Sequence, residues 1–155
     1  MAAEHTPPPQ VKAQQQATRV AQRLANVGAS QAQRHVTAAE QSGNANCIDR
    51  TSSDWQRVVD LARAVAITRA KRRDTITHGE VKWVILDELR RLVDAAAFED
   101  LLVAIGHEDD GAPLGAIIVD PDTGQPSDDY LLAAMERGFD EPPATLQRRV
   151  YEHFG

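Results

Sequence analysis

Apolar residues recur at helical spacing in five segments of the chain after residue 50. The spacing of three or four positions places them on one side of a helix, with polar residues on the other. The segments lie at about 53–73, 77–92, 95–107, 127–138 and 140–154. In the fourth segment the apolar residues are Tyr130, Leu131, Ala134 and Met135. The pattern therefore predicts five helices, each with one buried face.

Two short segments between these helices are expected to form strands. Thr75 and Ile76 are β-prone, and residues 114–119 (Leu-Gly-Ala-Ile-Ile-Val) form a continuous apolar run typical of a strand covered on both faces. Residues 120–124 have the chemistry of a tight turn, because Pro presets φ, Asp bonds locally and Gly accepts a positive φ. The next two residues are long enough only for a stub of a returning strand.

The start of the second predicted helix carries a capping signal. Thr77 precedes Glu80 by three positions, the arrangement in which each side chain bonds the backbone N–H of the other residue. His78 falls in the first turn of this helix, which favours a capping or surface role over catalysis. Trp83 lies off the main apolar stripe, which predicts a position beside the core or on a contact surface.

The first fifty residues differ from the rest of the chain. Residues 7–9 are three prolines, and five glutamines occur between Gln10 and Gln22. Apolar residues at positions 13, 17, 20, 24 and 27 form one helical stripe. Ser30 is a candidate cap for a second helix that extends to about Gln41. Because this region has too little apolar area for its own core, we expect a loose extension, with a helix that docks on a partner as the alternative.

The predicted order is helix, strand, helix, helix, strand, turn, strand stub, helix and helix. Its first seven elements match the winged-helix order, in which a helix-turn-helix precedes a β-hairpin wing. We therefore expect an α+β fold that is mostly α, namely a winged-helix-like domain over 51–155 with two added C-terminal helices. Residues 1–50 would form a flexible, Gln- and Ala-rich helical extension.

Short motifs in the chain resemble known families. Residues 76–81 (Ile-Thr-His-Gly-Glu-Val) resemble the Ile-Thr-Tyr-Gly-Glu-Leu opening of the winged-helix part of alkylguanine-DNA alkyltransferases. With residues 114–119 and 122–126 (Asp-Thr-Gly-Gln-Pro), they are more similar to an uncharacterised family of small prokaryotic and phage proteins, which shows Ile-Thr-Tyr-Gly-Glu, Leu-Ser-Ala-Leu-Val-Val and Thr-Gly-x-Pro. This chain has His78 where that family has Tyr, and Gly115 where it has Ser. The resemblance implies a winged-helix-like fold rather than a chemistry.

Composition predicts a soluble, unsecreted protein. The chain has 155 residues, of which 42% are hydrophobic and 26% charged, as in an ordinary globular domain. No apolar run approaches the roughly 20 residues of a membrane span, and residues 1–10 lack the pattern of a secretion signal. Cys47 is the single cysteine, which excludes an intramolecular disulfide and is consistent with the cytoplasm. Alkyl transfer is excluded as well, since no cysteine follows the predicted helix-turn-helix.

Charge is unevenly distributed along the chain. The net charge is −6, with +2 in residues 1–50, 0 in 51–105 and −8 in 106–155. Between residues 92 and 136 there is no Lys or Arg, whereas eleven residues are Asp or Glu. This stretch contains the predicted third helix and wing, a surface that winged-helix proteins usually place on DNA. Acidic side chains there would repel phosphate.

We therefore predict a non-enzymatic interaction or regulatory module that presents an acidic surface to a basic protein. A nucleic-acid-binding protein is one such partner, and it would suit a phage or defence setting. The expected partner-binding residues lie on the third helix, the loop after it and the wing: Glu99, Asp100, Glu108, Asp109, Asp110, Asp120 and Asp122. Neither a cofactor nor a membrane is expected to take part.

Two other functions remain open. A DNA-binding regulator would use basic residues of the first two predicted helices: Arg63, Arg69, Lys71, Arg72, Arg73 and Lys82. A metal-dependent phosphodiesterase would use the acidic cluster of His107, Glu108, Asp109, Asp110, Asp120, Asp122, Asp128 and Asp129. The metal hypothesis is the less favoured of the two, because acids in turns and at helix caps are usually solvated and the segment from residue 120 lacks EF-hand spacing.

Overall fold

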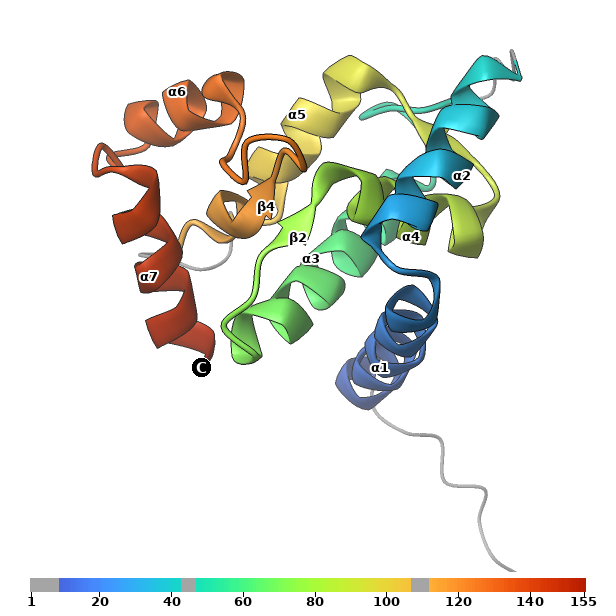
Figure 1. Ribbon diagram of the computed structural model, residues 1–155, viewed down its shortest axis with the longest axis horizontal. Helices are drawn as coiled ribbons and strands as arrows, with labels where there is room; N and C mark the ends of the chain where they lie inside the picture. Colours follow the sequence, from blue (N-terminus) through green and yellow to red (C-terminus); the bar gives the residue numbers. More distant parts are fainter. Residues whose placement is uncertain (1–8, 43–46, 107–111) are drawn as a thin grey trace, which may run out of the picture.

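The computed structural model describes residues 9–42, 47–106 and 112–155, with side chains from residue 15 onward. In this part of the chain the architecture is mostly helical, as expected for an α+β fold that is mostly α (Figure 1). The helices are α1 (Pro9–Val27), α2 (Ala29–Gln41), α3 (Trp55–Lys71), α4 (His78–Leu89), α5 (Ala95–Ala104), the 3₁₀ helix η1 (Leu114–Ile117), α6 (Asp128–Glu136) and α7 (Pro143–Phe154). The two-residue strands are β1 (Cys47–Ile48), β2 (Ile76–Thr77), β3 (Leu92–Val93) and β4 (Ile118–Val119). None of the described helices is long and apolar enough to cross a lipid bilayer.

Local capping signals set the starts of three helices. At α4 the predicted capping box is confirmed: Thr77 Oγ1 accepts from the Glu80 backbone N–H at 3.1 Å, and Glu80 Oε1 accepts from the Thr77 N–H at 3.0 Å. The Asp94 side chain caps α5, and the Ser127 side chain caps α6. These bonds satisfy backbone donors that a helix leaves unpaired in its first turn.

Burial around α4 and α5 differs from the sequence prediction at two places. Trp83 is buried rather than peripheral, because α4 packs against both α2 and α3 and therefore buries more than one stripe. α5 ends at Ala104 instead of His107, and the chain tightens there through a hydrogen bond from the Gly106 N–H to the Val103 carbonyl at 3.2 Å. Trp83 is therefore not available as a contact surface, and α5 is shorter than the pattern predicted.

Two pairs of parallel strands join segments that are far apart in the sequence. β1 pairs with β3, and β2 pairs with β4, with Ile76 opposite Ile118. The strand expected over 114–119 forms only at its last two residues, whereas its first four form η1. The reason is that β2 has only two residues, the second of which, Thr77, already caps α4. β4 therefore has no partner strand longer than two residues. The apolar run is buried all the same.

The returning strand of the predicted wing does not form among the described residues. The chain after β4 makes a closed turn, in which the Gly124 N–H donates to Asp120 O at 2.8 Å and the Asp120 N–H donates to Gln125 O at 2.9 Å. Pro126 has no N–H to donate, and Ser127 already caps α6, so no residues remain for a second hairpin strand. The expected hairpin is therefore replaced by a tight turn that leads directly into α6.

The N-terminal region is not the loose extension that its composition predicts. α1 packs against α3 and α2 packs against α4 (Figure 1). The side chains at these contacts are almost fully buried in the same core as the later helices: Val20, Leu24, Ala32 and Val36. Arg23 also forms ion pairs with Asp87, at 3.2 Å, and with Glu88 of α4. The apolar stripes are too small to make a core alone, but they cover apolar surface of α3 and α4.

The burial of Leu24 gives a direct test of this packing. Leu24→Ala should lower the free energy of unfolding by about 2–5 kcal/mol, the usual cost of a large-to-small change in a core. Gln22→Ala, an exposed change in the same helix, should stay within about 0.5 kcal/mol. Urea denaturation of the full chain measures both. Equal stability of the two variants would show that α1 is not packed on α3.

Candidate functional site

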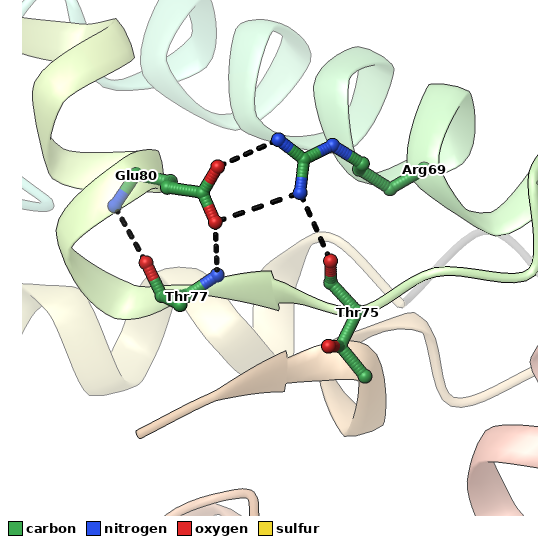
Figure 2. Close-up of polar contacts among 4 residues, drawn as sticks. All are labelled: Arg69, Thr75, Thr77 and Glu80. Atoms are coloured by element: carbon green, nitrogen blue, oxygen red, sulfur yellow. Dashed lines mark hydrogen bonds and ion pairs between the residues drawn. The ribbon is translucent and has the colours of Figure 1, made fainter. Parts of the chain in front are cut away.

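Arg69 and Glu80 form a buried ion pair between α3 and α4 (Figure 2). Arg69 Nη2 donates to Glu80 Oε2 at 2.6 Å, and Arg69 Nη1 donates to the Thr75 carbonyl at 3.0 Å. The Glu80 carboxylate also accepts the Thr77 N–H of the capping box, and only 4% of the residue is exposed. Arg69 was a candidate for contact with DNA. Its guanidinium instead links the end of α3 to the start of α4.

The other predicted basic residues separate into two groups. Arg63 and Lys82 are half-buried, and Lys82 Nζ lies 5.0 Å from the centre of the Phe98 ring, a cation–π contact. The remaining three are exposed where α3 ends, and we call them the basic turn: Lys71, Arg72 and Arg73. The six expected residues therefore do not form one continuous basic face, and the basic turn is the part that remains open to solvent.

Two of the predicted acids on α5 are engaged within the protein. Glu99 is half-buried and accepts a hydrogen bond from Ser127 Oγ at 3.1 Å. Burial raises the pKa of Glu99, as does the nearby charge of Asp129, while the Ser127 hydrogen bond opposes them. Asp100 pairs with Arg50 at 3.3 Å. Both acids contribute negative charge to this side of the molecule, but each already has a hydrogen-bond or ion-pair partner within the protein.

The acids of the predicted wing serve mainly as turn residues. Asp120 Oδ1 accepts from the backbone N–H of Asp122 at 2.7 Å and of Thr123 at 3.3 Å. This bonding holds the tight turn after β4. The Asp122 side chain is exposed to solvent. The remaining predicted partner-binding acids, Glu108, Asp109 and Asp110, lie outside the described residues.

α6 exposes a face that the sequence analysis did not single out. Met135 was expected to face inward with Tyr130 and Ala134, but this residue is 55% exposed and Leu132 is 59% exposed. The stripe they share also carries exposed acids, and we call these five residues the α6 face: Asp128, Asp129, Leu132, Met135 and Glu136. Positions three and four apart lie on one side of a helix, so the signal was present in the sequence. The sequence did not show that Tyr130 and Ala134, with Leu131 beside them, make the core contact of α6 and leave Met135 outside it.

Arg137 follows the α6 face directly but does not neutralise it. Its guanidinium donates to the carbonyls of Val103, at 3.5 Å, and Gly106, at 3.3 Å, near the end of α5. It also lies 5.9 Å from the centre of the Phe139 ring. Carbonyls at a helix end carry partial negative charge, so they bind a cation well. The cation closest in sequence is thereby turned inward.

His78 is the first residue of α4, and its side chain contacts α5 and β4. Its ring contacts Phe98 edge-on, with the centroids 5.4 Å apart, and its Nε2 atom is buried without a hydrogen-bond partner among the described residues. Burial lowers the pKa of His78, Lys82 lowers it further, and Asp120 and a hydrogen bond with the Ile118 backbone act in the opposite direction. The cap of α4 is supplied by Thr77, so His78 is a packed residue rather than a capping one.

The described residues do not gather the predicted metal-binding cluster. In residues 9–42, 47–106 and 112–155, no three His, Cys, Asp or Glu side chains come together in a way that suits a metal ion. Half of the predicted ligand set, His107, Glu108, Asp109 and Asp110, lies outside those ranges. Of the rest, Asp120 is engaged in its turn, and Asp128 and Asp129 belong to the α6 face.

No protein-family model matches the chain, and neither a curated protein nor a solved structure matches it. The family resemblance drawn from residues 76–81 and 114–119 therefore stays a prediction. Function has to be argued from the surfaces themselves, namely the acidic side formed by α5, the turn after β4 and α6, and the basic turn at the end of α3.

The buried ion pair predicts a large loss of stability when one partner is removed. Arg69→Ala should lower the free energy of unfolding by about 3 kcal/mol, because it leaves the Glu80 charge buried and unpaired. Adding Glu80→Gln should recover part of that loss, since Gln keeps the capping acceptor without the charge. Lys71→Ala, an exposed cationic change nearby, should cost less than about 0.5 kcal/mol in the same urea titration. A mild Arg69→Ala would contradict a structural role for this residue.

The lowered pKa of His78 predicts a loss of stability in mild acid. The unfolded chain binds a proton near the ordinary pKa of 6.5, whereas the folded chain binds it only at lower pH. The contribution is therefore complete above pH 6.5 and lost as pH falls below it. The unfolding midpoint in urea should fall between about pH 7.5 and 5.5 by more in the wild type than in His78→Gln. Other titrating groups, including Glu99, are common to both proteins and cancel. An equal fall would exclude His78 as the cause.

Proposed function

We propose that this protein is a non-enzymatic interaction module that binds a basic protein through its acidic side. The observation that carries the proposal is the stretch from 92 to 136, which has no Lys or Arg, together with the inward-turned guanidinium of Arg137. α5 and α6 thus supply no cation of their own, and the cation that follows α6 points away from its exposed face. Arg50 and Lys82 reach α5 from other elements, so the α6 end of this side is the part that lacks cations. A basic partner would supply the missing charge.

The available acids support contact through α6 more than through α5. Asp128, Asp129 and Glu136 are exposed, and none of them forms an ion pair with another described residue. Glu99 and Asp100 lie nearby, but each has an internal partner. Glu99 and Asp100 still add to the negative electrostatic potential, which extends about 8 Å from a charge at physiological salt. The exposed acids are the ones that can pair with a partner directly.

The order of elements supports a winged-helix-like ancestry for this surface, without the hairpin wing. α3, β2, α4, α5 and β4 occur in the same order as the corresponding elements of that fold, with β3 inserted before α5 and η1 before β4. In a DNA-binding member, the third helix and the wing would approach phosphate. Here those positions carry Glu99, Asp100, Asp120 and Asp122, so the arrangement favours a basic protein over DNA.

DNA binding is the second candidate, and the basic turn favours it. Lys71, Arg72 and Arg73 are consecutive and exposed, and three cations would pair with phosphates without any sequence readout. Arg69 is no longer available to this candidate because Glu80 holds it. The net charge of −6 also opposes approach to DNA. A salt-sensitive, nonspecific contact is the most that three cations would support.

Binding of a labelled Lys-rich peptide and of a labelled DNA duplex, measured by fluorescence anisotropy with the full chain, separates the two candidates. We expect the peptide to bind at low salt and to weaken as salt rises. Asp128→Asn/Asp129→Asn/Glu136→Gln should weaken it about tenfold, as three exposed charges worth about 0.5 kcal/mol each would do. The control Glu40→Gln/Asp60→Asn/Glu152→Gln changes the net charge equally at exposed sites elsewhere and should have a smaller effect.

The opposite pattern would replace the proposal with DNA binding. That pattern is a duplex that binds at low salt, loses affinity steeply as salt rises and is released by Lys71→Ala/Arg72→Ala/Arg73→Ala, while the peptide does not bind.

A further inference from the structure

Leu132 and Met135 stand out among the described residues as the large hydrophobic side chains that are exposed. They are three positions apart on α6, so their side chains lie side by side on the solvent face. Single exposed apolar residues are common on protein surfaces, but a neighbouring pair at the centre of a charged stripe is the arrangement of a contact site. Met is also well suited to such a place, because its flexible thioether adapts to different partners.

The opposite face of α6 holds the helix in a fixed orientation. Tyr130 is buried, and its ring lies so close to Gly115 that a Cβ atom there would stand 2.5 Å from it. Burial raises the pKa of Tyr130 to about 12, with Arg137 and a hydrogen bond to the Ala116 backbone acting against that rise. Ser127 caps the first turn. The α6 face is therefore a preformed platform, and little ordering is needed before a partner binds.

Acids stand at both ends of the apolar pair. Asp128 is four positions before Leu132, and Glu136 is four positions after it, so the three lie on one stripe. Asp129 lies beside Asp128 in the first turn. From Asp128 to Glu136 the helix rises about 12 Å. A ligand that matches this stripe has apolar groups at its centre and positive charges about 12 Å apart.

The charge pattern decides which kind of occupant fits. A second copy of the α6 face would set acids against acids, and anionic membranes or nucleic acids would be repelled in the same way. The cation next in sequence, Arg137, is bound to the carbonyls of α5 and does not cover the face. An amphipathic helix with a basic rim has the complementary pattern, since its apolar side chains recur every three or four residues and its cations flank them.

We propose that the α6 face is the docking site for a basic amphipathic helix of another protein. Apolar side chains of that helix pack on Leu132 and Met135. Lys or Arg residues about eight positions apart, the spacing that spans about 12 Å along a helix, pair with the acids at the two ends. This inference rests on the proposed function and makes it specific: it names the helix that binds and the chemistry of the partner. The contact is small, so the complex is transient and sensitive to salt.

Three synthetic peptides test the inference, and the first two have the same composition. The first, patterned peptide has Leu pairs between Lys residues that are eight positions apart, on an Ala background. The second has the same residues in scrambled order, so that Leu and Lys share no face of the helix. The third is the patterned peptide with every Lys replaced by Glu. Each is titrated with the full chain by fluorescence anisotropy, and the first also by amide chemical-shift mapping. We expect the patterned peptide to bind about tenfold more tightly than the scrambled one. Its shift changes should be confined to α6 and its neighbours.

Two matched variants separate apolar contact from charge. Leu132→Ser/Met135→Ser should weaken the patterned peptide about tenfold and leave the scrambled peptide unchanged. Leu132→Met/Met135→Leu keeps the apolar area and should restore binding. Both variants change exposed side chains, so their melting temperatures should match that of the wild type, which confirms that any loss is at the contact.

The possible outcomes bear on the two proposals differently. If both Lys peptides bind equally, and Leu132→Ser/Met135→Ser has no effect, then the docking inference is overturned while binding of basic partners stands. If no Lys peptide binds at low salt, both proposals fall. If sedimentation shows a dimer of the wild type that Leu132→Ser/Met135→Ser dissociates, a second copy occupies the face and the inference is overturned in favour of self-association. Tighter binding of the Glu peptide would also overturn it.

Discussion

The ion pair between Arg69 and Glu80 is the constraint on which the central part of the structure depends. Glu80 serves two purposes at once, because it closes the capping box at the start of α4 and accepts the guanidinium from the end of α3. Arg69 in turn binds the Thr75 carbonyl just before β2. A carboxylate buried to this degree is tolerated only when donors surround it. The last turn of α3, the approach to β2 and the first turn of α4 are therefore fixed together.

From this junction a series of contacts leads to the α6 face. β2 pairs with β4, which places β4 beside α4, and η1 just before it packs against α3, α5, α6 and α7. Gly115 in η1 gives room for the Tyr130 ring, so α6 is held by its buried side and presents Leu132 and Met135 to solvent. A side chain at Gly115 would meet the ring and the Leu102 carbonyl, and α6 would have to move. The exposed pair is thus a consequence of core packing some distance away.

Local chemistry predicted the features that depend on a few neighbouring residues. The capping box at Thr77 is confirmed, because a helix start is decided within four positions. Features that depend on distant partners were predicted poorly. The composition of the first fifty residues predicted a loose extension without a core of its own. The apolar stripes of α1 and α2 are nevertheless buried, because they pack on α3 and α4. Likewise, the acid-rich stretch was visible in the sequence, but the pairing of Asp100 with Arg50, and of Glu99 with Ser127, was not.

The negative character of the α6 face follows from how α5 ends. Arg137 stands directly after α6, where a solvent-facing cation would neutralise Glu136 and weaken the attraction for a basic partner. Its guanidinium instead donates to the carbonyls of Val103 and Gly106 at the end of α5, where backbone carbonyls carry partial negative charge. One arginine therefore has two effects, since it satisfies the end of α5 and leaves the acids of α6 uncompensated. The uncompensated charge of this surface is set by hydrogen bonds at the end of another helix, which explains why composition located the acidic stretch but not the acids that are left without an ion pair.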